Sequence, residues 1–379
     1  MLVGRVRGRA PGHGRLDSGT VTWHVRNIGP DDRERYEDFL ASLGVDPQLT
    51  FYHSWEWGEV IAERSRRLER VALEHRGELV AVGQVGLEDD HRVSFWYAPR
   101  GLAMDHSDPE RVTAAYGALR DHYRGREGAA FLRVDPNVER GTPAEAALDA
   151  AGGRRAAIFT QAERCWVAEV QPTLEAQMQW LKEHGLKSNT RRLFNKSRKA
   201  GVTVRASDDP QDLETLISML GELDVRKGGI GKHDDEHYRT QFARMAPAGH
   251  QKLFLAELDG QVGAVSLMAI YGREASFLHG ASSGEEHLRK LSPSYLLHLQ
   301  TMAWLAEHRP EVTSYNFWGI VSDENRNPGH PRHGYSEFKR SFGGYKVEYV
   351  RSREFAYRPL HRSALYLLEA YRTKRYQND

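Results

Sequence analysis

The sequence repeats itself at an offset of about 183 residues. In each copy two strand-like runs flank a glycine turn, and a third strand-like run, a helical run and a short apolar run follow. The matched segments are 71–77 with 254–260, 79–85 with 262–268, 93–97 with 275–279, 108–123 with 293–308, and 131–135 with 315–319. Five consecutive elements in one order indicate a duplicated domain and predict a mixed α/β fold, with α+β character, in two tandem units.

Composition limits the function classes. At 379 residues the chain exceeds one ordinary core, and its net charge of +1 gives no overall attraction to nucleic acid, so such binding needs a local patch. The single cysteine, Cys165, excludes a disulfide framework, fits a reducing, cytoplasmic compartment, and lies in an apolar run typical of a buried structural thiol. Residues 1–20 are basic and glycine-rich without the apolar core of a signal peptide, so we expect a disordered leader.

A local basic patch lies between the two copies. Leu193 and Phe194 are spaced to face inward on a helix while the surrounding cations face outward. The cations within residues 182–199 are Lys182, Lys187, Arg191, Arg192, Lys196, Arg198 and Lys199. This helix is either a solvated surface or a site for a polyanion such as RNA phosphate.

Chemistry-bearing residues follow the last strand of each copy. Asp135 ends a buried run beside Arg133, where a carboxylate receives an ammonium or accepts a proton, or forms a structural Arg–Asp pair. In the second copy, residues 314–320 lead into a polar loop, and Lys339 follows beyond it. Lys339 is either a solvated cation or a fixed charge aimed at a developing oxyanion.

Three segments resemble known functional motifs but lack features that those motifs require. Residues 228–232 resemble a P-loop, but Arg226 replaces its first glycine and His233 its Ser or Thr. Residues 280–284 match G-x-S-x-G, yet no helix follows at once, so we expect Ser282 in a plain loop. The histidine pairs within 233–237 and 330–333 lack a defined third ligand, which argues against a metal site.

Several motifs recur in a characteristic order and spacing over about residues 30–358. They are Ser54-Trp-Glu-Trp-Gly58; Tyr97-Ala-Pro-Arg-Gly101 with Asp105; Leu132-Arg-Val-Asp-Pro136; residues 187–201; Ser292-Pro-Ser-Tyr295; Tyr315-Asn-Phe-Trp-Gly-Ile320; and Phe338-Lys339 before Gly343-Gly344. In this order and spacing the chain resembles the FemABX family of aminoacyl-tRNA-dependent peptidyltransferases.

The resemblance implies two tandem GNAT-like domains, with the C-terminal segment returning to complete the first. The first domain then comprises residues 21–165 and 346–379, and the second comprises residues 166–345. No long charged helical insert is visible, so the chain resembles the compact type without a coiled-coil arm.

The resemblance also implies transfer of an amino acid from a charged tRNA to an amine, usually on the stem peptide of a peptidoglycan precursor. Phe338 and Lys339 match the family's Phe-Lys pair near the ester, and Asp135 matches its strand-end Asp near the amine, so these three are the predicted catalytic residues. The predicted substrate-binding residues are Trp57, Arg100, Arg133, Lys232, His233, Tyr238, Tyr295 and Trp318. The predicted tRNA-binding residues are Lys187, Arg191, Arg192, Lys196, Arg198 and Lys199.

We expect no cofactor beyond the aminoacyl-tRNA co-substrate. Residues 289–294 and 105–109 lack the glycines with which ordinary GNAT enzymes hold the pyrophosphate of acyl-CoA. Glu59 and Ile61 stand where some members carry a phosphate-binding lysine, and His233 stands where others carry an arginine.

The acceptor therefore remains open between a peptidoglycan precursor and a small amine or peptide in natural-product assembly. A third hypothesis is a catalytically silent double-GNAT protein that binds RNA. We expect a monomer, and no run approaches the ~20 apolar residues of a membrane span.

Overall fold

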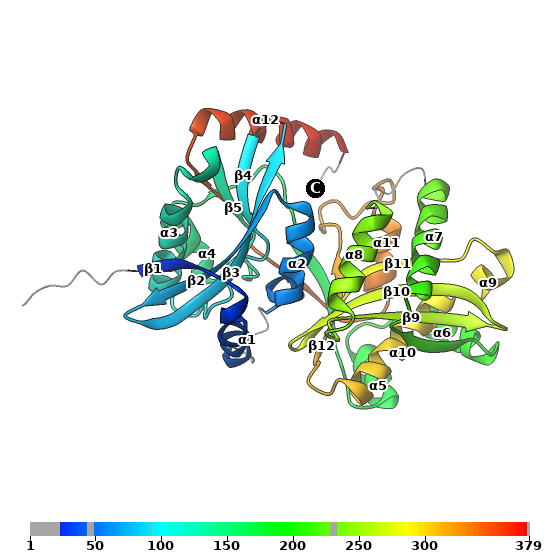
Figure 1. The fold of residues 1–379 in the computed structure, drawn as a ribbon. Helices are drawn as coiled ribbons and strands as arrows, with labels where there is room; N and C mark the ends of the chain where they lie inside the picture. Colours follow the sequence, from blue (N-terminus) through cyan, green and yellow to red (C-terminus); the bar gives the residue numbers. More distant parts are fainter. Residues whose placement is uncertain (1–22, 44–48, 92, 228–232, 377–379) are drawn as a thin grey trace, which may run out of the picture.

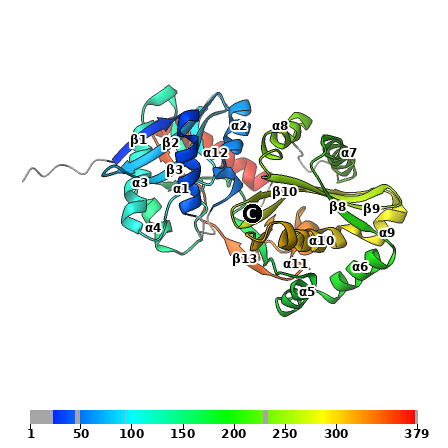
Figure 2. The ribbon, with the colours of Figure 1, turned by 60° about the horizontal axis from the view of Figure 1, so that its bottom comes forward.

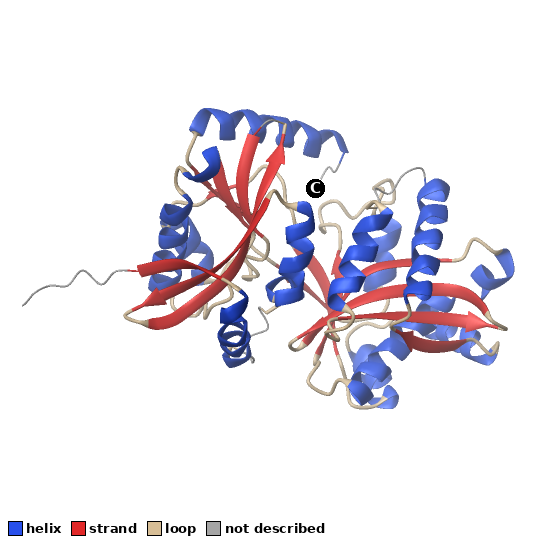
Figure 3. Cartoon of the chain, in the orientation of Figure 1, coloured by secondary structure: helices blue, strands red, loops and turns tan. Residues whose placement is uncertain are grey.

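The computed structural model describes residues 23–43, 49–91, 93–227 and 233–376. These residues form two seven-stranded sheets side by side, each with helices packed against it (Figures 1 and 3). The first sheet has the order β1 (Trp23–Ile28), β2 (Arg67–His75), β3 (Glu78–Asp90), β4 (Val93–Ala98), β5 (Phe131–Val134), β14 (Arg353–Ala356) and β6 (Arg154–Arg155). The second has the order β13 (Tyr345–Glu348), β7 (Arg164–Glu169), β12 (Ser314–Gly319), β11 (Glu274–Ser282), β10 (Gln261–Tyr271), β9 (Gln251–Leu258) and β8 (Thr203–Ser207).

The predicted duplication is confirmed element by element. β2, β3, β4 and β5 of the first sheet correspond to β9, β10, β11 and β12 of the second. The helices α3 (Pro109–Tyr123) and α10 (Pro293–His308) occupy the matching place before the last strand of each set. Among the strands that the structure describes, only the pairs β4–β5 and β11–β12 run parallel, because a helix carries the chain back between them.

Helices cover both faces of each sheet. Successive side chains of a strand point to opposite faces, and apolar side chains on both faces must be buried. In the second sheet, Phe254 and Met268 face α10, α5 (Leu174–Glu183) and α6 (Ser188–Lys199), whereas Leu253 and Leu267 face α7 (Pro210–Lys227) and α8 (Asp235–Met245) (Figure 2). In the first sheet, α3 and α4 (Pro143–Ala150) pack on one face and α12 (Pro359–Tyr376) on the other. The longest helices in these described ranges have 18 residues, which is too short for a coiled-coil arm. Among the described residues, no helix is long and apolar enough to cross a bilayer.

The two sheets exchange their sixth strands. In the second sheet the partner of β12 is β7, which directly follows the first-domain segment. In the first sheet the partner of β5 is β14, which the chain reaches only after completing the second sheet. Residues 345–356 therefore contain two short strands, β13 and β14, in different sheets, because the chain crosses between the domains within this segment.

The domains meet through an apolar interface. Helix α2 (Trp55–Arg64) packs against α8, and a cluster joins Phe51 and Tyr52 of the first domain to Met245, Ala269 and Trp318 of the second. The interface thus brings the region around α2 against the end of β12.

Candidate active site

The ends of the duplicated strands β5 and β12 come together at the domain interface. Trp318, near the end of β12, stacks on Tyr52 with ring centroids 6.2 Å apart. The guanidinium of Arg100, from the loop after β4, lies 5.3 Å from the Trp318 ring centroid. The backbone N–H of Arg100 donates a 2.8 Å hydrogen bond to Asp135, which directly follows β5. Arg100 therefore links the strand end of the first copy to that of the second.

Asp135 is only 3% exposed, and each of its carboxylate oxygens accepts a hydrogen bond. One partner is the N–H of Arg100 and the other is the Tyr97 hydroxyl at 2.9 Å. Gln161 continues the chain, donating to the Tyr97 hydroxyl at 3.2 Å and accepting from the Tyr52 hydroxyl at 2.5 Å. Burial raises the pKa of Asp135 to about 6, against the opposing charge of Arg100. A carboxylate that titrates near neutral pH suits a proton acceptor for an amine.

The predicted substrate contact of Arg133 is not supported. Its Nε donates to Glu354 at 3.0 Å, its Nη2 donates to Glu369 at 2.9 Å, and the residue is 2% exposed. The structural pair considered with Asp135 is not observed either, because both ion-pair partners come from β14 and α12. Arg133 therefore fastens the returning C-terminal segment to the first sheet.

Lys339 lies on α11 (His333–Arg340) and is completely buried, which excludes the solvated alternative. Its Nζ donates a 2.7 Å hydrogen bond to the carbonyl of Gly319 at the end of β12. The ring of Tyr335, one helical turn earlier and 46% exposed, covers Nζ at 3.9 Å from its centroid. Desolvation lowers the pKa of Lys339 well below its ordinary value. An anionic group beside Nζ would favour the ammonium form.

Phe338 and Tyr295 lie in the core beside Lys339. The Phe338 ring packs 5.1 Å from that of Tyr295 and 5.1 Å from that of Phe342. Both side chains are partly buried members of the second-domain core, so their contacts fix the orientation of α11.

The backbone at the end of β12 is strained, and a series of hydrogen bonds between buried polar side chains stabilises it. Trp318 has a φ of 67°, which is uncommon for a bulky residue, and its N–H donates to the Asn316 side chain at 2.7 Å. Asn316 in turn donates to Glu274 at 3.1 Å, and the Ser276 hydroxyl donates to the other oxygen of Glu274 at 2.5 Å. Asn316 and Glu274 were not among the predicted site residues. An amide in a buried aromatic run is a sequence signal for Asn316, whereas Glu274 directly follows a turn, where a charged residue is ordinarily exposed.

We expect Asn316→Ala to lower the free energy of unfolding by about 1–3 kcal/mol, because it leaves the Trp318 N–H and Glu274 without their buried partner. Transfer should also slow, since the Gly319 carbonyl that holds Lys339 follows Trp318 directly. Denaturant unfolding and the transfer rate are the measurements, with the exposed loop residue Asn327→Ala as the matched control. Unchanged stability in Asn316→Ala would contradict the role of this chain of hydrogen bonds.

A group of histidines lies where α2 faces α8. The centroid of the His233 ring is 4.3 Å from that of His237 and 5.9 Å from that of His279. The backbone N–H of His233 donates to the Tyr238 hydroxyl at 3.2 Å. Arg64 of α2 donates to Nδ1 of His237 at 2.7 Å across the interface. Burial lowers the pKa of His237 to about 4 and that of His279 to about 3, so both rings are neutral at pH 7.

This histidine group is not arranged as a metal centre. Among the described residues, no set of three His, Cys, Asp or Glu side chains is placed to hold a metal ion. The predicted site residue Lys232 lies outside the described residues. Trp57, also predicted to bind substrate, packs edge-on against Phe51 and Tyr52 at 5.0 and 4.8 Å, so it belongs to the apolar interface.

The predicted basic helix forms as α6, with Phe194 buried as expected. The cations that point outward and are exposed are Arg191, Arg192, Lys196, Arg198 and Lys199. None of these five forms an ion pair within the described ranges, whereas Lys187 at the N-cap pairs with Glu337 of α11 at 3.2 Å. The positive face is therefore largely uncompensated, and its start is tied to the helix that carries Lys339.

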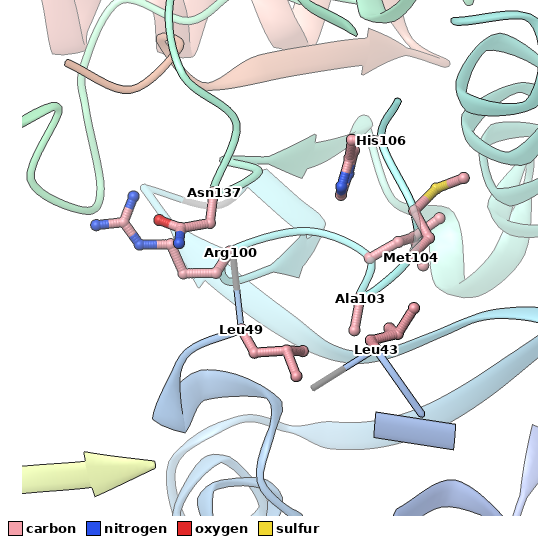
Figure 4. A pocket seen from close by; sticks show the side chains of 8 residues that line it. Leu43, Leu49, Arg100, Ala103, Met104, His106 and Asn137 are labelled. Carbon is pink, nitrogen blue, oxygen red and sulfur yellow. The ribbon is translucent and has the colours of Figure 1, made fainter. Parts of the chain in front are cut away.

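A small cavity lies beside the loop that holds Asp135 (Figure 4). It has a volume of about 10 Å³, enough for about one water molecule, so no substrate occupies it in this conformation. Its lining consists of Leu43, Leu49, Arg100, Leu102, Ala103, Met104, His106 and Asn137.

Cys165, predicted to be structural, is indeed a buried free thiol, and burial raises its pKa to about 11.

Comparisons with known proteins agree with this architecture. The FemAB family model matches residues 33–147, and an acetyltransferase (GNAT) domain model matches residues 184–340. A search of curated protein sequences gave no significant match. Together the two family matches support acyl transfer as the class of reaction.

Solved structures show the same tandem fold. The crystal structure of FemX is 19% identical, with a TM-score of 0.76 over 91% of this chain and 100% of that chain. L-PGS from Bacillus licheniformis is 13% identical, with a TM-score of 0.51 over 91% and 98% of the two chains. A tandem GNAT protein from the clavulanic acid biosynthesis pathway is also 13% identical, with a TM-score of 0.51 over 89% and 99%. Residues 33–147 thus match the FemAB family, residues 184–340 match an acetyltransferase (GNAT) domain, and the chain as a whole has the fold of FemX.

Proposed function

We propose that this protein transfers an amino acid from an aminoacyl-tRNA to an amine of a peptidoglycan precursor peptide and so forms an amide bond. One observation carries the proposal: two buried ionisable groups contact matching strand ends of the duplicated domains. Asp135, with a pKa of about 6, directly follows β5, and Lys339 donates to the Gly319 carbonyl at the end of β12. One group accepts a proton and the other compensates negative charge, as aminolysis of an ester requires.

The proposed reaction divides these roles between the domains. The amine nitrogen attacks the ester carbonyl of the aminoacyl-tRNA, and Asp135 takes the proton that the nitrogen loses. Negative charge develops on the carbonyl oxygen, where it favours the ammonium form of Lys339. The C–O bond to the tRNA then breaks, its 3′-terminal ribose oxygen takes up a proton, and the amide remains. No covalent intermediate with the enzyme is needed.

Two features support a donor other than acyl-CoA. At the start of α3, two backbone N–H groups already bond the Asp108 carboxylate at 3.0 and 3.1 Å, and that carboxylate repels a pyrophosphate. Before α10, the Leu291 carbonyl accepts from the Ser197 hydroxyl at 2.7 Å, so α6 covers the corresponding turn. A tRNA donor also gives a purpose to the uncompensated cations of α6.

The α6 surface gives a direct test of tRNA binding. We expect Arg191→Ala/Arg198→Ala to weaken tRNA binding at least about tenfold and to reduce the slope of log affinity against log salt by about 1.5. Filter binding across a salt series measures both quantities. The matched control is Arg111→Ala, an exposed arginine on α3 of the first domain, which should leave the slope unchanged. Equal slopes for wild type and the α6 variant would remove this helix from the tRNA site.

The interface also supports an anionic acceptor. Arg64 supplies a cation on α2, the helix on which Glu59 and Ile61 replace the expected lysine, and it reaches His237 beside His233. Precursor phosphates at this position would pair with Arg64 and accept hydrogen bonds from the neutral imidazoles.

The second candidate keeps the chemistry but uses a small amine or peptide in natural-product biosynthesis as the acceptor. Glu59 favours it, because this residue stands where some family members carry a phosphate-binding lysine, and it offers a phosphate no cation. The weaker third candidate is a non-catalytic double-GNAT protein that binds RNA through α6.

A transfer assay with charged tRNA and a panel of acceptors separates the candidates. Transfer to a UDP-linked muropeptide supports the proposal, and transfer only to amines unrelated to the cell wall supports the second candidate. Retention of tRNA without transfer to any acceptor would leave the RNA-binding candidate.

A further inference from the structure

Lys339 cannot be reached from the solvent in this conformation. The residue is 0% exposed, its Nζ bonds the Gly319 carbonyl, and the ring of Tyr335 covers it. In the proposed reaction, on which the following inference rests, Nζ stabilises the negative carbonyl oxygen of the ester, which must then come within hydrogen-bond distance. One of the groups around Nζ therefore has to move before this contact can form.

Tyr335 is the group that is placed to move. The ring centroid of Phe277 lies 6.0 Å from Nζ, but this residue is 5% exposed and belongs to β11 in the middle of the second sheet. Gly319 is held in β12 of the same sheet. Tyr335, by contrast, is 46% exposed, so its ring lies between the lysine and the solvent. Rotation of its side chain can uncover Nζ without disturbing the sheet.

No hydrogen bond of the Tyr335 hydroxyl has to break when the ring turns. Among the described residues this hydroxyl has no hydrogen-bond partner. Although almost half of the residue is exposed, desolvation raises the pKa of the hydroxyl, which is therefore shielded from water in this position. A hydroxyl without a partner gains a hydrogen bond to water when its ring swings outward. The closed position is thus held mainly by the contact with Lys339.

The first turn of α11 is held less firmly than the rest of the helix. The Ser336 hydroxyl accepts a hydrogen bond from the Val321 N–H at 3.0 Å, which fixes the helix just before Lys339. Ahead of Ser336, the N-cap residue makes no capping hydrogen bond with its side chain. The first turn also contains Gly334, a poor helix former whose Cβ position has no atom within 4 Å. The part of the helix that carries Tyr335 can therefore adjust while Lys339 stays in place.

We propose that Tyr335 is a gate over Lys339. When the aminoacyl ester binds, the ring turns outward, and the carbonyl oxygen of the ester takes its place beside Nζ. While the gate is closed, the ring keeps water away from the lysine. Tyr335 makes or breaks no covalent bond in the reaction, so its role is to control access to the charge that Lys339 supplies.

Carbamoylation by cyanate, which reacts with neutral amines, tests whether the ring covers Lys339. Mass spectrometry of the digested protein measures the rate, with the partly exposed Lys346 as the internal reference. We expect Lys339 to react at least about tenfold faster in Tyr335→Ala than in the wild type, because the variant leaves Nζ open to solvent. Tyr335→Phe keeps the ring and should react like the wild type. Tyr345→Ala is the matched control, since Tyr345 is 42% exposed and lies on β13.

Fluorine NMR tests whether the ring turns. With fluorotyrosine at position 335, we expect the signal to shift when a tRNA that carries its amino acid through a stable amide bond is added. The signal of fluorotyrosine at position 345 should stay in place.

Equal reaction of Lys339 in the wild type and in Tyr335→Ala would overturn the inference, and so would an unmoved signal at position 335 with this tRNA bound. Faster reaction in Tyr335→Phe would also contradict it, because the ring is still present. Failure of the tRNA to bind at all would instead refute the proposed donor. The labelling experiment uses no RNA, so it decides whether the ring covers Lys339 in either case.

Discussion

Lys339→Met is expected to lower the transfer rate by about 10²–10³-fold while leaving the protein as stable as the wild type or more stable. The rate falls because the variant has no cation to compensate the oxyanion. Stability is kept because methionine fills the same buried space without a charge that burial disfavours. The loss of the hydrogen bond to the Gly319 carbonyl opposes this gain by about 1 kcal/mol.

The dependence on pH separates this account from a simple packing effect. Folding lowers the pKa of Lys339 below its ordinary value of 10.5. The cost of burying the lysine is therefore fully present below the lowered pKa and disappears as the pH rises towards 10.5. The melting temperatures of the wild type and of Lys339→Met should therefore approach each other as the pH rises towards 10.5. Lys346→Met, a partly exposed lysine paired with Asp323, is the control; near-normal turnover in Lys339→Met would sink the proposed role.

Asp135→Asn is expected to reduce kcat/KM for the acceptor by about 10²–10⁴-fold and to leave tRNA binding unchanged. The amide keeps the size of the side chain and can still accept from the Arg100 N–H, but it cannot take a proton from the amine. A defect in tRNA retention, with acceptor use intact, would contradict this assignment.

The pKa of Asp135 also sets the acid limb of the wild-type rate. Folding raises this pKa from 3.8 to about 6, and the base form exists only above it, so the rate should fall as the pH drops through about 6. Stability responds in the opposite sense: the cost of the buried carboxylate is present above pH 6 and is relieved as the pH falls from about 6 towards 3.8. Asp105→Asn, which removes an exposed carboxylate from the loop after β4, is the matched control and should keep the acid limb.

The repeat predicted the fold well because its signals are local. Alternating apolar residues, glycine turns and a helix beginning at Pro109 each act within a few residues, and all reappear in the structure. The exchange of β7 and β14 was not predictable in the same way. Each of these strands pairs with an edge far away along the chain, and no local pattern encodes which edge that is.

The sequence indicated which residues lie near the candidate site, but it did not indicate which residues they pair with or how deeply they are buried. Arg133 lies on β5 and Asp135 directly follows this strand, so their closeness in sequence suggested a pair, but Arg133 pairs with carboxylates more than 200 residues away. The burial of Lys339 was equally hidden, because Glu337 and Arg340 beside it are charged. Only the packing of α11 against the end of β12 places the lysine inside.

The strand exchange has a mechanical consequence. The chain crosses between the domains twice, and the two crossing segments pair as antiparallel strands: Val347 pairs with Cys165, Glu348 pairs with Arg164, and the Tyr349 N–H donates to the Glu163 carbonyl at 2.7 Å. Two crossings that are hydrogen-bonded to each other restrict the relative movement of the domains more than one flexible linker would, because both must move together. In the proposed reaction, this restriction would help to keep Asp135 and Lys339 in one alignment.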